Sequence, residues 1–258
     1  SRFDDRVTGK LSSFAQQAKI AHIDIDPAEM GKLVQPDYPV IGDLKKVLQE
    51  ILAQINAQKR EKWINKILDW KAANPLSYDR NESEEIKPQH LLEELNNAIR
   101  TQKFILATDV GQHQMWSAQY IQIPSPRSFL TSGGLGTMGF GFPAAIGAKM
   151  ACPDSLVITT AGDGSIQMNI QELATVAVNN IDVKIIIFNN GVLGMVHQWQ
   201  DLFFEKRFSH SVLNNSPDFV LLAEAYGLKG MRISKKDEVK AGVNFLLETE
   251  SSAILDVT

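Results

Sequence analysis

The 258-residue sequence contains a single cysteine, Cys152, which excludes an internal disulfide and a cysteine-rich zinc site. It also lacks a basic excess, because 26 Lys and Arg against 30 Asp and Glu leave a formal net charge of −4. Such a chain is not suited to bind nucleic acid or an anionic membrane surface through charge. No apolar run approaches the ~20 residues of a spanning helix, and no secretory signal opens the chain. We therefore expect a protein of a reducing compartment.

The composition is that of an ordinary globular protein, with 44% hydrophobic and 22% charged residues. The length predicts one or two domains. The chain begins at Ser1 rather than Met and stops directly after an expected strand at 253–257. We therefore expect a piece of a longer protein.

The first part of the chain, residues 1–57, resembles the end of a domain. Residues 18–26 predict a buried strand, and 43–57 predict a helix with Asp43 as its N-cap and one apolar stripe. A single strand and helix cannot enclose a core, so this part is expected to be a remnant of an α/β domain. Charged residues and turn signals then dominate 58–87, which we interpret as a linker that includes a short helix near Trp63.

Residues 88–258 alternate between short apolar strands and helices, which predicts a parallel sheet with helices on both faces. In such a sheet the loops at the carboxyl ends of the strands bind the ligand. The expected strands are 104–108, 156–160, 183–188, 228–233 and 253–257, and the expected helices are 138–151, 166–178, 217–226 and 235–248.

The loop after 156–160 carries the strongest chemical signal. Gly162, Gly164 and the start of the next helix would admit a phosphate, and Asp163 is an oxygen ligand suited to Mg²⁺. Asn190 follows the next strand, one strand–helix–strand step later, so both side chains are expected at the same edge of the sheet. This pattern is typical of thiamine-diphosphate enzymes; the alternative is a pair of ordinary Gly/Asn turns.

A second glycine-rich stretch, 134–139, matches the G-x-G-x-x-G pattern of dinucleotide-binding folds. That interpretation needs an acidic residue near 155–160 to hold the ribose. Asp154 comes too early and 156–160 has none, so the sequence disfavours an NAD site.

Three further segments, Val110–Trp116, Ser132–Gly141 and Leu193–Trp199, carry a specific resemblance. Together they make residues 88–258 similar to the cofactor-binding domain of the acetohydroxyacid synthase (acetolactate synthase) family. Residues 1–57 resemble the end of that family's central, FAD-binding domain. The nearest alternatives are another thiamine-diphosphate enzyme, such as a pyruvate oxidase or other carboligase, and a non-catalytic cofactor-binding module.

The resemblance implies a catalytic subunit that decarboxylates pyruvate and joins the remaining two-carbon unit to pyruvate or 2-ketobutyrate, in branched-chain amino-acid biosynthesis. It implies thiamine diphosphate, Mg²⁺ and FAD as cofactors, and a homodimer or homotetramer with the active site at the subunit interface. A small regulatory subunit and a location in bacterial cytoplasm or a plastid are also implied. The family's catalytic glutamate lies on a domain that nothing here matches, so the chain alone is expected to be inactive.

The resemblance also assigns site residues. Asp163, Asn190 and the carbonyl of Val192 would hold Mg²⁺. Met138 would bend the cofactor, Trp199 would select the second substrate, and Arg6 would meet a keto-acid carboxylate; the alternative for Met138 and Trp199 is that they fill core. The remaining thiamine-diphosphate contacts would be Val110, Gly111, Gln112, His113, Gly136, Gly162, Gly164, Ser165, Leu193, Gly194 and Met195. The FAD contacts would be Phe3, Asp4, Asp24, Ile25, Asp43 and Leu44, of which Asp24 could instead cap a strand end.

Overall fold

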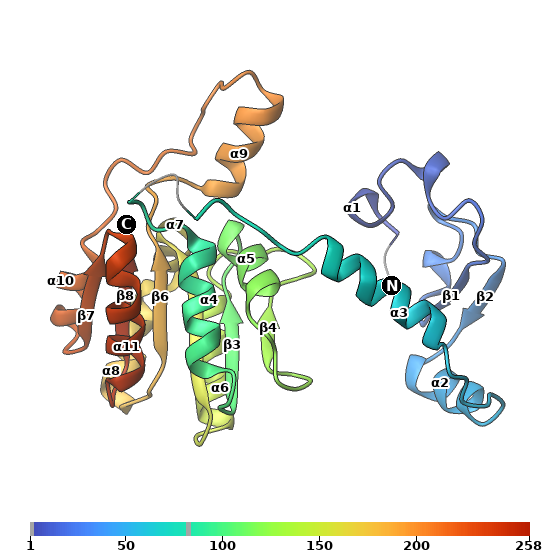
Figure 1. Cartoon of the computed structure of the whole chain (residues 1–258), viewed down its shortest axis with the longest axis horizontal. Helices are drawn as coiled ribbons and strands as arrows, with labels where there is room; N and C mark the ends of the chain where they lie inside the picture. The colour runs from blue at the N-terminus through green and yellow to red at the C-terminus, as the bar shows by residue number, and fades with distance from the viewer. Residues whose placement is uncertain (1–2, 81–83) are drawn as a thin grey trace. The chain divides into compact units, whose positions relative to one another are not determined.

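The computed structural model describes residues 3–80 and 84–258, and the chain divides into two compact units, Ser1–Pro75 and Leu76–Thr258 (Figure 1). The boundary between them lies inside the stretch 58–87 that we interpreted as a linker. The amino-terminal half of that stretch forms a 13-residue helix, α3 (Glu61–Ala73), which belongs to the first unit.

The first unit contains one two-stranded sheet. Its two strands, β1 (Ala21–Asp24) and β2 (Tyr38–Ile41), pair in parallel with Asp24 opposite Ile41. None of the residues of α2 (Leu44–Leu52) is buried, although the helix carries the predicted apolar stripe. The helix also ends at Leu52 rather than at 57 as predicted, and β2 was not predicted. The other elements are α1 (Asp5–Thr8), η1 (Leu11–Ser13) and η2 (Pro27–Glu29).

The second unit is built on one six-stranded sheet in the order β4-β3-β5-β6-β8-β7, in which all neighbours are parallel. Its strands are β3 (Phe104–Thr108), β4 (Phe129–Thr131), β5 (Leu156–Gly162), β6 (Lys184–Phe188), β7 (Lys229–Ile233) and β8 (Ala253–Val257). Its helices are α4 (Pro88–Ile99), α5 (Gln112–Tyr120), α6 (Gly141–Ala151), α7 (Asp163–Ile166), η3 (Gln167–Glu172), α8 (Leu173–Asn179), α9 (Gly194–Phe203), α10 (Phe219–Ala225), η4 (Lys236–Glu238) and α11 (Val239–Glu248).

Helices cover both faces of this sheet, which confirms the predicted fold class. Alternate residues of one strand enter different cores: Phe104 and Leu106 pack under α4 and α11, whereas Ile105 and Ala107 pack against α6 and α8. Figure 1 shows α4 and α11 side by side in front of the sheet. A strand covered on both faces needs a continuous apolar sequence, which is the pattern that predicted it.

Several helices differ from the prediction. The helix expected from 138 begins only at Gly141, and the single helix expected over 166–178 is three short segments with a kink at Asn169. β4, α5 and α9 were not predicted, because β4 has three residues and α5 lacks a distinct apolar face. Within the two described ranges, no helix is both long and apolar enough to cross a membrane.

A buried lysine stabilises the amino-terminal edge of the sheet. The Lys184 ammonium donates to Asp182 Oδ1 at 2.5 Å and to the carbonyl oxygens of Thr249 (2.5 Å) and Ser251 (2.8 Å). These bonds join the start of β6 to the segment that enters β8. Hydrogen bonds to a charged group stabilise a protein more than neutral ones do. Loss of the Lys184 ammonium would also leave the Thr249 and Ser251 carbonyls without this hydrogen-bond donor.

Lys184→Met should therefore lower the free energy of unfolding by about 3 kcal/mol, measured by urea denaturation with circular dichroism. Lys229→Met, which removes an exposed lysine from β7, is the matched control and should change stability little. Equal midpoints for the two variants would contradict the structural role of Lys184.

Candidate functional site

The candidate site lies where the three adjacent strands β3, β5 and β6 end. Because these strands are parallel and paired in this order, the loops that follow them meet at one edge of the sheet. The loop after β3 begins at Asp109, β5 continues directly into α7 at Asp163, and Asn189–Leu193 follows β6. The predicted phosphate and metal loops are therefore neighbours.

Asp163 connects two of these loops. Its side chain is almost completely buried, and Oδ2 accepts hydrogen bonds from the Gly191 amide (3.1 Å) and the Ser216 hydroxyl (3.2 Å). Burial raises the pKa of Asp163, and these hydrogen bonds oppose the rise. A buried carboxylate of this kind is stabilised by a bound cation.

The other two predicted metal ligands lie in the turn that supplies the Gly191 amide. Asn190 Oδ1 accepts a hydrogen bond from the Val192 amide at 3.2 Å. A returning segment holds this turn: the Leu193 amide donates to the Ser211 carbonyl at 2.7 Å, and the Leu213 amide donates to the Gly191 carbonyl at 2.8 Å. The turn that would present the Val192 carbonyl is thus fixed on both sides.

Side chains from three other segments lie close to Gly164, in the first turn of α7. A Cβ added at Gly164 would lie 2.6 Å from Leu193 Cδ2, 3.0 Å from Leu213 Cδ1 and 3.9 Å from Met138 Cε. Three segments far apart in sequence therefore place apolar atoms at this point. A side chain at this position would displace the ends of these side chains.

The neighbouring glycine, Gly194, opens α9 under similar crowding. A Cβ at Gly194 would meet Gln112 Oε1 at 2.2 Å and Asn190 Nδ2 at 3.3 Å. Gln112 Nε2 in turn donates to Gln198 Oε1 at 2.9 Å. The segment that follows β3, the Asn190–Val192 turn and α9 are thus in direct contact.

His113 is buried between the loop after β3 and β6. Its ring stacks on Phe188 with centroids 6.4 Å apart, and it is hydrogen-bonded to the Asp109 backbone. Burial lowers the pKa of His113 to about 4, so the ring is neutral at pH 7. Nε2 has no hydrogen-bond partner within the part of the chain that the structure describes. A Cβ at Gly162 would lie 3.4 Å from this ring, so His113 faces the predicted phosphate loop.

The remaining predicted thiamine-diphosphate residues surround the same edge. Gly136 and Gly111 adopt positive φ angles of 69° and 152°, and a Cβ at Gly136 would lie 3.8 Å from Val110 Cγ1. The Ser165 hydroxyl accepts from the Gly162 amide at 2.9 Å and donates back to the Gly162 carbonyl at 3.2 Å. The hydroxyl therefore orders the loop, and its predicted donation to a diphosphate stays a prediction.

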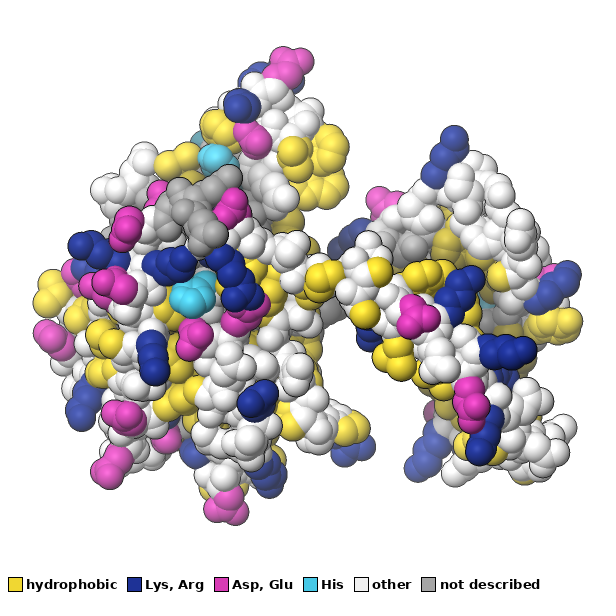
Figure 2. Space-filling view, in the orientation of Figure 1, with side chains coloured by type: hydrophobic (Ala, Val, Ile, Leu, Met, Phe, Trp, Pro, Cys, Tyr) yellow, Lys and Arg dark blue, Asp and Glu magenta, His cyan; other side chains and the backbone are white. Residues whose placement is uncertain are grey.

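Trp199 and Met195 both lie on α9. Trp199 is 57% exposed, which argues against the alternative that it fills core. Figure 2 shows hydrophobic side chains gathered on the segment that contains α9. The exposed apolar residues of this segment are Val196, Trp199, Leu202, Phe203, Phe204 and Phe208.

The donor set fits magnesium and a diphosphate. One buried carboxylate, one amide oxygen and a backbone carbonyl are hard oxygen donors of the kind that Mg²⁺ prefers. Among residues 3–80 and 84–258 there is no group of three His, Cys, Asp or Glu side chains that could hold a metal. A metal here would therefore rely on the mixed set that the sequence predicted.

The other predicted residues lie in the first unit. Asp24 is the last residue of β1, and Asp43 lies just after the end of the paired strand β2. Asp43 caps α2 by accepting from the Lys46 amide at 3.1 Å. Phe3 packs edge-on against His22, and Arg6 pairs with Asp4 at 3.5 Å. Ile25 and Leu44 are exposed. The roles toward FAD and a keto acid stay predictions.

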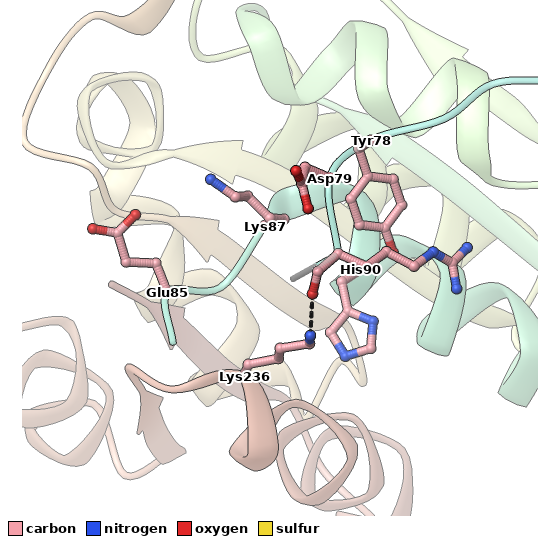
Figure 3. A pocket seen from close by; sticks show the side chains of 7 residues that line it. Tyr78, Asp79, Glu85, Lys87, His90 and Lys236 are labelled. Atoms are coloured by element: carbon pink, nitrogen blue, oxygen red, sulfur yellow. Dashed lines mark hydrogen bonds between the residues drawn. The ribbon is translucent and has the colours of Figure 1, made fainter. Parts of the chain in front are cut away.

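A separate pocket of about 290 Å³ lies where the chain enters the second unit (Figure 3). Two of its cations have internal partners: Arg80 pairs with Glu93 at 3.0 Å, and Lys236 donates to the Arg80 carbonyl. Tyr78 also donates to Glu93, at 2.6 Å. Carboxylates and cations are mixed in this pocket, so it does not offer a ligand site of one charge sign. The contacts of Tyr78 and Arg80 with Glu93 hold the entering chain against α4.

Three residues at the site were not assigned a role from the sequence: Asp109, Asn169 and Ser216. Asp109 directly follows the predicted strand 104–108, and this position at a strand end is the signal that could have identified it. Ser216 lies in a long irregular segment, and no local pattern connects it with Asp163. The hydrogen bond from Asn169 to the Gly139 carbonyl likewise has no sequence signature.

The fold and site together define a class of protein: a parallel α/β domain whose strand ends present oxygen ligands and glycine loops suited to a metal-bound diphosphate. A family model described as "Thiamine pyrophosphate enzyme, C-terminal TPP binding domain" matches residues 109–257, and "Thiamine pyrophosphate enzyme, central domain" matches residues 1–51. The first match covers more than half of the chain. The chain therefore belongs to the thiamine pyrophosphate enzymes, which confirms the predicted thiamine-diphosphate family.

Similar curated proteins point to one kind of enzyme within this family, acetolactate synthase. A "Probable acetolactate synthase large subunit" of Methanocaldococcus jannaschii is 47% identical over 99% of this chain and 44% of that protein. An acetolactate synthase large subunit of Cyanidium caldarium is 44% identical over 99% of the chain and 44% of its own length. The isozyme 2 large subunit of Escherichia coli is 42% identical over the whole chain and 46% of its own length. The chain thus spans less than half the length of these curated relatives.

Buried, neutral His113 should make the second unit sensitive to acid. The unfolded imidazole takes up a proton near pH 6.5 and the buried one only near pH 4, so protons favour the unfolded state between these values. This single group should lower the free energy of unfolding by about 2 kcal/mol between pH 7.5 and pH 5. His113→Gln should remove that part of the pH dependence in urea denaturation, whereas the control His90→Gln should retain it. An unchanged pH dependence in His113→Gln would refute the assignment.

Proposed function

We propose that this chain supplies the magnesium–thiamine diphosphate half of the active site of an acetolactate synthase large subunit. The observation that carries the proposal is the joined arrangement of Asp163 and the Asn190–Val192 turn beside His113 and Gly164. The names of the similar proteins support the choice of reaction.

In this proposal the protein contributes placement and electrostatics. Thiamine diphosphate, when bound, supplies the electron sink that permits loss of carbon dioxide from a 2-keto acid. Asp163, Asn190 and the Val192 carbonyl would hold Mg²⁺, the amides at the start of α7 would donate to the diphosphate, and His113 would cover it from the loop after β3. Met138 would support the cofactor rings, and exposed Trp199 would contact the second keto acid, pyruvate or 2-ketobutyrate.

The proposal extends to the whole protein. Its substrates are pyruvate and a second 2-keto acid, and Arg6 meets a substrate carboxylate. FAD binds at the central domain through Phe3, Asp4, Asp24, Ile25, Asp43 and Leu44. The assembly is a homodimer or homotetramer that shares its active site between subunits, with a possible small regulatory subunit, in bacterial cytoplasm or a plastid. A relative in Zea mays is named as chloroplastic.

The metal assignment is tested by calorimetry of the chain with thiamine diphosphate and Mg²⁺. Asp163→Ala should weaken binding by at least ~100-fold, since it removes the one carboxylate of the metal site. Removing Mg²⁺ with a chelator should have the same effect on the wild-type chain. Asp154→Ala, an exposed carboxylate just before β5 at the opposite edge of the sheet, is the control and should bind normally. Unchanged affinity in Asp163→Ala would overturn the ligand assignment.

The reaction is tested by product analysis. The purified chain should bind the cofactor without forming acetolactate from pyruvate, because the resemblance places a catalytic glutamate on a domain that this chain does not match. The whole protein should form acetolactate, and acetohydroxybutyrate when 2-ketobutyrate is added. Acetyl phosphate or another product in place of acetolactate would favour a pyruvate oxidase or a different carboligase, and rapid turnover by the chain alone would contradict the half-site.

A further inference from the structure

We propose that Asp109 is a positioning residue that sets the placement of the Gly136–Gly141 loop, and with it Met138, over the thiamine diphosphate site. The inference rests on the proposed function only for the identity of the ligand. The placement itself follows from hydrogen bonds within the chain.

Asp109 follows the last residue of β3 and is completely buried. Its Oδ1 accepts hydrogen bonds from the Val110 amide at 2.8 Å and the Gly139 amide at 2.9 Å, and its Oδ2 accepts from the Gly141 amide at 3.0 Å. One carboxylate therefore joins two loops that are 30 residues apart in sequence. Charge-assisted hydrogen bonds to backbone amides are shorter and stronger than neutral ones.

The carboxylate also caps a helix from another part of the chain. α6 begins at Gly141, and its N-cap residue, Phe140, offers no side-chain acceptor. The first amides of a helix need acceptors and favour negative charge, and Asp109 supplies both to Gly141. A Cβ at Gly141 would lie 2.4 Å from the Asp109 amide nitrogen, so the helix start packs directly on the end of β3.

Gly139 is held from two sides. Its amide donates to Asp109, and its carbonyl accepts from Asn169 Nδ2 at 2.6 Å. The residue has a φ of 91°, and a Cβ there would meet Asn169 and Met168 at 2.7 Å. Asn169 departs from helical geometry at the kink in η3. Two polar side chains thus fix the backbone immediately after Met138.

The site has two halves in this arrangement. Asp163 and the Asn190 turn form the metal–diphosphate half, and the Asp109 carboxylate makes no hydrogen bond to this half among the described residues; only the Asp109 backbone is hydrogen-bonded to His113. Val110, Gly136 and Met138 form the proposed half beneath the cofactor rings, and all three hydrogen bonds of the Asp109 carboxylate go to the two loops of this half. Loss of Asp109 should therefore weaken binding of the rings and leave binding of the diphosphate group intact.

The experiment compares two probes on the chain: Mg²⁺ with thiamine diphosphate, and Mg²⁺ with inorganic pyrophosphate, which lacks the rings. Asp109→Asn keeps the size of the side chain and removes one acceptor. It should weaken thiamine diphosphate by about 10-fold or more and change pyrophosphate affinity less than about 2-fold. Asn169→Ala releases the same loop from its other side and should give the same selective loss.

Amide hydrogen exchange gives a readout that needs no cofactor. In Asp109→Asn the peptide that contains Gly139 and Gly141 should exchange about 10-fold faster or more, while peptides from β5 and β6 should not change. Ser252→Ala is the matched control: it removes another buried side chain that accepts from a backbone amide, that of Val183 at 2.8 Å, at the opposite edge of the sheet. This control should lower stability without altering either probe.

The outcomes are distinct. Equal loss of both probes in Asp109→Asn would show a general structural role and overturn the inference, and so would unchanged affinity for both. Binding of neither probe by the wild-type chain would refute the proposed function, and the exchange result would then decide the role of Asp109 by itself. Unchanged exchange across 136–141 would overturn the inference in every case.

Discussion

Parallel pairing of the six strands in the second unit is the constraint on which the rest of the site depends. Because every strand runs in the same direction, β3, β5 and β6 all end at one edge, and three loops from distant parts of the sequence meet there. The helices that connect these strands cover both faces of the sheet, so Phe104 and Ile105, which are neighbours in one strand, enter opposite cores. The stability of the sheet and the geometry of the site therefore have one physical cause.

The carboxyl edge of the sheet concentrates groups that are costly to bury. Asp163 has a raised pKa, His113 is kept neutral with an unpaired nitrogen, and Asp109 is fully enclosed but accepts three amide hydrogen bonds. A buried polar group without a partner lowers stability. Asp109 is compensated within the fold, whereas Asp163 and His113 are compensated only in part. This difference separates the residue that shapes the loops from the two that we propose as ligand contacts.

The sequence predicted the five longer strands of the second unit and the two loops that hold Asp163 and Asn190. The strands could be predicted because buried parallel strands are continuous apolar runs. The loops could be predicted because Gly, Asp and Asn follow directly after these runs. It did not predict β4, α5 or α9, and it started α6 three residues early. β4 is too short to form a pattern, and α6 begins at Gly141 because Asp109, more than 30 positions earlier, supplies its cap.

By itself, then, the sequence determined the fold class, the thiamine-diphosphate family and the two side chains suited to Mg²⁺, since each follows from local composition and spacing along neighbouring strands. Only the tertiary structure decided how the loops are held. Ser216 is hydrogen-bonded to Asp163, Gln112 to Gln198, and both Asp109 and Asn169 to Gly139. Those contacts join residues 30 to 86 positions apart. Side-chain hydrogen bonds of that range leave no periodic signal in a sequence, because their geometry exists only after the sheet has formed.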